Sequence, residues 1–105
     1  MLAAALAVPA FAADRAPTRS EKSVITAATR SFLKGGTGVP NARILGIRVD
    51  GTYARAKTSA PGVDPATAIL RQRRGKWSVR EFGTSLDCRG VPERVREDLD
   101  LPCGG

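Results

Sequence analysis

The side chains that most enzymes use for acid–base and nucleophilic chemistry are scarce in this sequence. Its 105 residues include no histidine, so no imidazole can activate a serine or cysteine nucleophile, and metal sites lose their commonest ligand. The acids that we place on strands are Asp50, at a turn, and Glu81, at a strand end, and neither position favours catalysis. We therefore expect no catalytic residue, no metal site and no cofactor.

The two cysteines, Cys88 and Cys103, do not have the C-x-x-C spacing of a redox or zinc motif. In an exported chain two thiols usually pair. We predict a Cys88–Cys103 disulfide, which in the chain-entropy description stabilises the domain by about 3 kcal/mol, mostly through the unfolded state.

Basic side chains are the feature that points most directly to a function. The formal net charge is +7, and many cations fall on strands that we expect to be neighbours. These cations are Arg48, Arg55, Lys57, Arg71, Arg73, Arg74, Lys76 and Arg80. If their outer faces align, they form a basic strip that attracts an anionic cell-surface polymer, lipid head groups, an acidic protein or nucleic acid.

Two considerations limit this interpretation of the basic strip. No aromatic residue interleaves with the cations, so we expect no sequence-specific nucleic-acid recognition. Charged side chains also solvate a sheet face and protect its edge without binding anything, and this alternative stays open.

The first residues predict export. Residues 1–12 form an apolar run that Pro9 breaks, and Ala10-Phe11-Ala12 is a small-x-small pattern that signal peptidase accepts, with the cut before Ala13. The run is too short to span a bilayer, so we expect no transmembrane segment in the mature chain. No basic residue follows Met1, so either the true start lies upstream or the signal is atypical. We predict a secreted or extracytoplasmic protein, with a signal peptide over 1–12 and a single domain over 13–105.

Hydrophobic periodicity predicts an N-terminal helix. It begins at a capping box formed by Thr18 and Glu21, and Gly35-Gly36 ends it. Its apolar stripe recurs at intervals of three and four residues. The stripe consists of Val24, Ile25, Ala28 and Phe32.

Strict alternation then predicts two strands, over 44–50 and 52–58. In the first, Leu45, Ile47 and Val49 share the inner face. Asp50-Gly51 is a two-residue hairpin signal, and the small side chains of Ala54 and Ala56 in the second strand let the helix lie close.

Two further strands follow. Residues 59–65 contain two prolines and a glycine and are expected to form a loop. The third strand, over 66–74, directs either Ala68 and Leu70 or Thr67 and Ile69 inward, and the pattern does not choose between these pairs.

Arg74-Gly75-Lys76 makes a tight turn into the fourth strand, where Trp77 and Val79 share a face and Trp77 anchors the core. Gly83-Thr84 closes the sheet. After Val91, Pro92 begins a short helix over 93–101. The disulfide between Cys103 and Cys88 then ties this helix to the end of the sheet. The predicted class is α+β, with one N-terminal helix packed on a four-stranded antiparallel sheet and a short, disulfide-clipped C-terminal helix.

Several of these sequence runs are similar to runs in a known group of small exported domains. Residues 47–56 (IRVDGTYARA), Leu70 with residues 75–79 (GKWSV), Gly83-Thr84 and the cysteine pair together resemble small exported domains of actinobacteria. The helix-on-curved-sheet shape of those domains is similar to cystatin-like and nuclear-transport-factor-2-like folds. The resemblance covers most of the mature chain and implies a fold more than a function, because that fold hosts enzymes, inhibitors and inert modules alike.

Three hypotheses of function follow. The preferred one is a non-catalytic exported binding module whose basic sheet face holds an anionic or acidic partner. The alternative is an extracellular protease or hydrolase inhibitor that presents residues 59–65 or 35–41. A small-ligand pocket protein is a third hypothesis, and it requires a cavity between helix and sheet.

Overall fold

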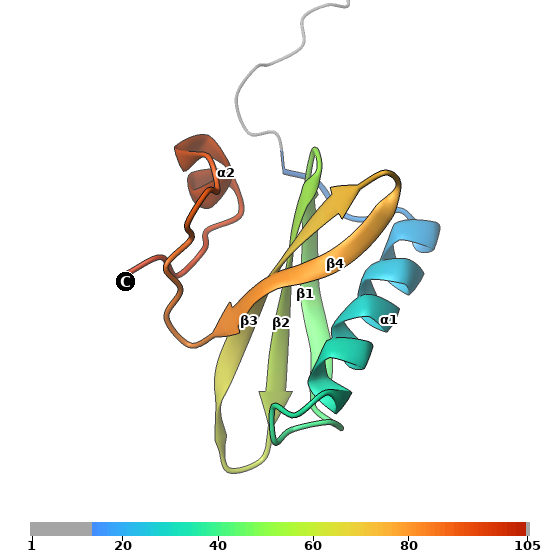
Figure 1. The fold of residues 1–105 in the computed structure, drawn as a ribbon, viewed down its shortest axis with the longest axis vertical. Coiled ribbons are helices and arrows are strands. Elements are labelled where there is room, and N and C mark those ends of the chain that lie inside the picture. The colour runs from blue at the N-terminus through green and yellow to red at the C-terminus, as the bar shows by residue number, and fades with distance from the viewer. Residues whose placement is uncertain (1–13, 105) are drawn as a thin grey trace, which may run out of the picture.

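The computed structural model describes residues 14–104 and has the predicted α+β architecture (Figure 1). The strands form one antiparallel sheet in the order β1-β2-β3-β4. The elements are α1 (Arg19–Lys34), β1 (Arg43–Asp50), β2 (Tyr53–Ala60), β3 (Val63–Arg73), β4 (Lys76–Gly83) and α2 (Glu93–Asp98). The predicted signal peptide and its cut before Ala13 lie outside the described residues.

The start of α1 is the capping box that the sequence predicts. The backbone N–H of Glu21 donates to Thr18 Oγ1 at 3.1 Å, and Thr18 N–H donates to Glu21 Oε1 at 2.9 Å. The guanidinium of Arg15 donates to both Glu21 oxygens, at 2.7 and 2.8 Å. These bonds, with that from Thr18, lower the pKa of Glu21 to about 2.

The buried face of α1 differs from the predicted stripe. Ile25, Thr29 and Leu33 are fully buried, whereas Val24 and Phe32 are 45% and 39% exposed. The stripe prediction is therefore wrong at Val24 and Phe32. Thr29 replaces them inside at little cost because its hydroxyl donates to the carbonyl of Ile25 at 2.8 Å.

A β-bulge reverses the predicted faces at the start of β1 only, because Ile47 and Val49, after the bulge, face α1 as predicted. Leu45 pairs with Lys57 and Arg48 with Arg55, so β1 holds one residue more than β2 over this stretch. Gly46 lies in the bulge with φ +62°, which glycine adopts without strain. As a result Ile44 packs toward the core and Leu45 is 45% exposed, contrary to the prediction for Leu45.

The predicted loop over 59–65 is wrong. Ala60 pairs with Val63, so the chain turns through Pro61–Gly62 alone and both strands continue to that turn. Between the pairs Thr58–Ala66 and Ala60–Val63 the β3 strand contains one extra residue. This irregularity accommodates Pro65, which has no N–H to give to a regular ladder.

The remaining hairpins have two-residue turns. Arg73 pairs with Lys76, and Arg74–Gly75 form the turn with φ of +53° and +78°, as the sequence predicts. At the first hairpin Asp50 pairs with Tyr53 and ends β1, so the turn residues are Gly51–Thr52, one position later than predicted.

Each face of the sheet contributes residues to a buried cluster. Toward α1, the core holds Ala54 and Ala56, as predicted, and Trp77 at 8% exposure. This packing resolves the open choice on β3, because Ala68 and Leu70 lie on this side. Ile69, on the opposite face, is equally buried.

The C-terminal segment covers part of the face opposite α1. Leu86, Val91, Leu99 and Leu101 pack there with Tyr53 and Ile69 of the sheet. The predicted Cys88–Cys103 disulfide is present, with a Cα–Cα distance of 5.7 Å. Pro92 caps α2 and does not begin it, and the helix ends at Asp98. Within residues 14–104 no helix has both the length and the hydropathy that crossing a bilayer requires.

Candidate functional site

The predicted cations lie in two different environments. Arg48, Arg55 and Arg71 point to the side of the sheet that the C-terminal segment covers, and each has a structural contact there. The β3–β4 hairpin carries Arg73, Arg74 and Lys76, all exposed. Lys57 is exposed beside Gly46, and Arg80 is exposed at a β-bulge of β4.

Arg48 and Arg55 are directly opposite each other on β1 and β2, and both are compensated within the chain. Arg48 Nη2 lies 2.9 Å from the carboxylate of Asp14. Arg55 donates to the carbonyl of Leu99 at 2.8 Å and to that of Gly46 at 3.0 and 3.2 Å. Burial lowers the pKa of Arg55, Asp100 opposes this shift, and the nearby Arg48 adds to it. Both arginines hold this part of the fold together.

Arg71 stacks on an aromatic ring. Its guanidinium carbon lies 5.3 Å from the centroid of the Tyr53 ring, within cation–π range. The Tyr53 hydroxyl in turn donates to the carbonyl of Gly90 at 3.4 Å. Arg71 Nε is buried and has no hydrogen-bond acceptor among the described residues, so the contacts of this guanidinium are mainly with the Tyr53 ring.

The β3–β4 hairpin contains a second pair of opposed cations. Arg73 and Lys76 are directly paired across the strands, and two positions before Arg73 on β3, Arg71 faces Ser78. Arg74 adds a third exposed charge at the turn. In the described part of the chain, no ion pair or hydrogen bond neutralises the side chains of Arg73, Arg74 or Lys76. The sheet therefore concentrates free positive charge at this hairpin.

The two acids singled out from the sequence, Glu81 and Asp50, both lie next to the C-terminal segment. The carboxylate of Glu81 accepts the backbone N–H of Asp87 at 2.6 Å and that of Cys88 at 2.9 Å, which fixes the start of the C-terminal segment. Asp50 is 8% exposed beside Asp98 of α2. Burial raises the pKa of Asp50, and the Asp98 carboxyl raises it further. Sequence reasoning missed this pair, because the two residues are far apart along the chain.

Residues 14–104 contain no group of three or more His, Cys, Asp or Glu side chains that could hold a metal ion. Among these residues, exposed and uncompensated charge gathers at the β3–β4 hairpin, on Arg73, Arg74 and Lys76.

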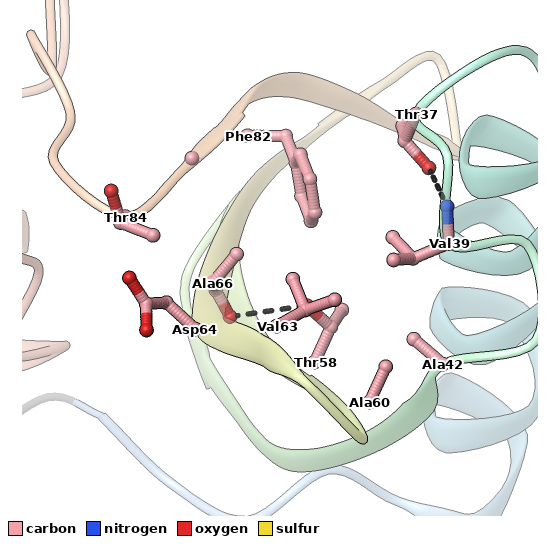
Figure 2. A pocket seen from close by; sticks show the side chains of 11 residues that line it. Thr37, Val39, Ala42, Thr58, Ala60, Val63, Asp64, Ala66, Phe82 and Thr84 are labelled. Atoms are coloured by element: carbon pink, nitrogen blue, oxygen red, sulfur yellow. Dashed lines mark hydrogen bonds between the residues drawn. The ribbon is translucent and has the colours of Figure 1, made fainter.

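A cavity of about 300 Å³ lies where the sheet extends past the end of α1 (Figure 2). Its walls come from both segments proposed for an inhibitor, because Thr37 and Val39 belong to residues 35–41 and Ala60 and Val63 to residues 59–65. Phe82 of β4 forms the opposite wall. The sequence could not reveal this cavity because it depends on how far the β2–β3 hairpin reaches past the helix.

Comparisons with family models, with curated proteins and with solved structures found no match to this chain. The functional argument therefore depends on the residues themselves.

Proposed function

We propose that the protein is a non-catalytic, exported binding module that holds an anionic partner at the β3–β4 hairpin. The Cys88–Cys103 disulfide supports the extracytoplasmic location, because such bonds persist in oxidising compartments. The partner is an anionic surface polymer or an acidic protein, and the binding site consists of Arg73, Arg74 and Lys76, with Arg71 beside them.

The observation that carries this proposal is the difference between the two opposed cation pairs. Like charges directly across a strand pair are destabilising. Asp14 and the backbone carbonyls compensate Arg48 and Arg55, whereas Arg73 and Lys76 have no counter-ion among the described residues. A bound polyanion would relieve this repulsion by supplying the negative charge that the chain does not provide there.

The test is a triple variant of the hairpin, Arg73→Glu, Lys76→Glu and Arg74→Asn. Asparagine suits the left-handed φ of +53° at Arg74. Binding of polyphosphate and of polyglutamate is measured by calorimetry at increasing salt. We expect the affinity for polyphosphate to fall by about tenfold or more, and the slope of log K against log salt to flatten by roughly 2 to 3, since each lost phosphate contact removes about one counter-ion.

A matched control separates the hairpin from net charge. Arg19→Glu, Lys22→Glu and Lys34→Gln change the formal charge by the same amount on the exposed face of α1. The control should retain most of the affinity. Equal losses in both triple variants would contradict a localised site and leave only general attraction to a basic protein. Comparison of the two polymers tells a phosphate preference from a carboxylate preference.

A second candidate function, inhibition of an extracellular hydrolase, is favoured by one observation. The segments 35–41 and 59–65 meet at the same end of the sheet and present an exposed edge there, with Val63 50% exposed. An inhibitor complex at this end should persist in high salt and survive the hairpin triple variant. Replacement of Pro61–Gly62 by a longer turn should disrupt it, and a complex that dissolves in salt would exclude this candidate.

A further inference from the structure

The cavity is lined by the first residues of β3, at the opposite end of that strand from the β3–β4 hairpin (Figure 1), so the proposed anion site does not use it. Its floor is formed by Thr58 and Ala66, which are buried. Val39, from the connection between α1 and β1, and Phe82 of β4 point into it from two sides. Its volume of about 300 Å³ is at the small end of the range for ligand pockets.

The walls of the cavity are held in place by contacts within the chain. Arg30 Nη1 donates to the carbonyls of Pro40 and Ala42, at 3.0 and 2.6 Å. The Thr37 hydroxyl accepts the backbone N–H of Val39 at 3.3 Å. Because the connection from α1 to β1 is fixed in this way, ligand binding would not carry the entropy cost of ordering it.

The interior of the cavity is apolar in character. The hydroxyls of Thr37 and Thr58 are already engaged, since they donate to the carbonyls of Leu33 and Ala66, at 3.0 and 3.4 Å. Apart from Asp64 and Thr84, most of the remaining surface is hydrocarbon, contributed by residues such as Val63 and Phe82. Burial of such surface favours the hydrocarbon part of a ligand.

One charged side chain, that of Asp64, is among the residues that line the cavity. It is exposed, and in Figure 2 its carboxylate lies near Thr84, outside the group of side chains of Val39, Val63 and Phe82. Asp64 makes no hydrogen bond or ion pair with the described residues. This side chain therefore offers a free negative charge next to an apolar interior, although the whole chain is strongly basic.

We propose that this cavity binds a small amphiphile with a hydrocarbon body and a cationic head, of the alkylammonium class. The body lies between Val39, Val63 and Phe82, and the head lies at the Asp64 carboxylate. At roughly 30 Å³ for each water-sized group, a cavity of about 300 Å³ admits a chain of about ten non-hydrogen atoms. This ligand has the opposite charge to the partner of the β3–β4 hairpin. The cavity site and the hairpin site can therefore be tested independently.

Three probes of equal chain length test the proposal on the intact protein: octylammonium, octanol and octanoate. The shifts of the Val39 and Val63 methyl groups in NMR titrations report binding in the cavity. We expect octylammonium to bind several-fold more tightly than octanol and octanoate to bind most weakly. General attraction to a chain of net charge +7 predicts the reverse order for the two ions, so tighter binding of octanoate would overturn the proposal.

Variants identify the two parts of the site. Asp64→Asn should reduce the affinity for octylammonium to that for octanol and leave octanol unchanged. Asp87→Asn removes another exposed carboxylate away from the cavity and should change neither. Ala60→Phe should fill the cavity and abolish binding of all three probes. If that variant fails to fold, as judged by Trp77 fluorescence, Val63→Ser tests the same wall and should weaken all three.

Two results would refute the site. One is an unchanged preference for octylammonium in Asp64→Asn. The other is the absence of methyl shifts with every probe. In that second case, a captured hydrolase that protects the backbone amides of Ala60 or Val63 from hydrogen exchange would show that the occupant is an apolar side chain of a protein, as the inhibitor hypothesis requires.

Discussion

Replacement of Asp50 by asparagine should stabilise the protein at neutral pH. Asp50 is 8% exposed at the end of β1, and its Oδ2 has no hydrogen-bond partner among the described residues. The carboxyl of Asp98, on α2, lies next to it, and its Oδ2 has no hydrogen-bond partner there but lies 3.7 Å from Arg94 Nε. Burial and then the neighbouring acid raise the pKa of Asp50, so its ionised form is the unfavourable one in the folded protein.

The sign of the pH dependence follows from this raised pKa. A carboxyl whose pKa is raised by folding contributes its stability in full below the unfolded value, about 3.9 for Asp, and loses it as the pH rises through the folded value. The contribution of Asp50 to the free energy of unfolding should therefore fall between that unfolded value and neutral pH. An asparagine side chain does not ionise, so the Asp50→Asn variant should not show this loss.

The size of the effect can be bounded from the contacts. A buried polar group without a partner costs about 1–3 kcal/mol. Arg94 opposes the shift in the pKa of Asp50 and so compensates part of this cost. We therefore expect Asp50→Asn to raise the free energy of unfolding at neutral pH by about 1–2 kcal/mol, the lower part of that range.

Urea denaturation followed by Trp77 fluorescence, repeated from about pH 4 to neutral pH, measures this difference. Asp64→Asn is the control, because Asp64 is exposed and should leave the pH dependence unchanged. Parallel stability curves for wild type and Asp50→Asn, or a less stable variant at neutral pH, would refute the reasoning. Either result would mean that the Asp50 carboxylate is satisfied in the folded protein.

Three further predictions concern the parts of the fold that position the surfaces described above. Replacement of Cys88 and Cys103 by serine should lower the free energy of unfolding by about 3 kcal/mol for this 15-residue separation; an unchanged urea midpoint would contradict it. Gly46→Ala should lower the free energy of unfolding by about 1–2 kcal/mol because of the left-handed φ. The steric addition is small, since the new Cβ meets only the flexible Lys57 side chain at 3.4 Å. A thermal melt that matches wild type would show that the bulge tolerates a side chain. Glu81→Ala should lower the free energy of unfolding by about 1.5–3 kcal/mol and lower the hydrogen-exchange protection of the backbone amides at residues 87 and 88. Glu81→Gln should lose less of this stability and protection. Equal protection in wild type and both variants would refute the role of this carboxylate.

Most of the local structure could be predicted because its causes are local. The Thr18–Glu21 capping box, the Arg74–Gly75 turn and the pairing of two cysteines each depend on a few neighbouring residue types or on simple counting. The small side chains of Ala54 and Ala56 likewise identify the face that α1 covers.

The errors arise where the partner strand decides the outcome. The extra residue at Gly46 exchanges Leu45 and Ile44 between the two faces, and strict alternation cannot show this until the register with β2 is known. Pro61 and Pro65 suggested a long loop, but one occupies a two-residue turn and the other an irregular position where its missing N–H is tolerated.

The candidate site could be predicted only in part for a similar reason. The sequence identified the cations, but it could not show which of them the chain itself would use. Arg55 reaches the carbonyl of Leu99 only because the C-terminal segment folds back over that face, and Arg71 stacks on Tyr53 because the register of β2 and β3 pairs the two residues. The hairpin cations lie beyond this cover, and their free charge is a property of the tertiary fold.

The Gly46 bulge has a consequence for the behaviour of the protein at high concentration, because β1 is an edge strand. Near one end of β1, Arg15 pairs with Val49 through hydrogen bonds of 2.8 and 2.9 Å, and the following Pro17 has no N–H to continue the ladder. Further along, the guanidinium of Arg55 occupies the carbonyl of Gly46. An approaching strand from another molecule therefore meets an irregular and partly occupied row of donors and acceptors. This edge should resist the strand-to-strand stacking from which fibrils grow, even though a hydrophobic side chain, that of Leu45, is exposed beside it.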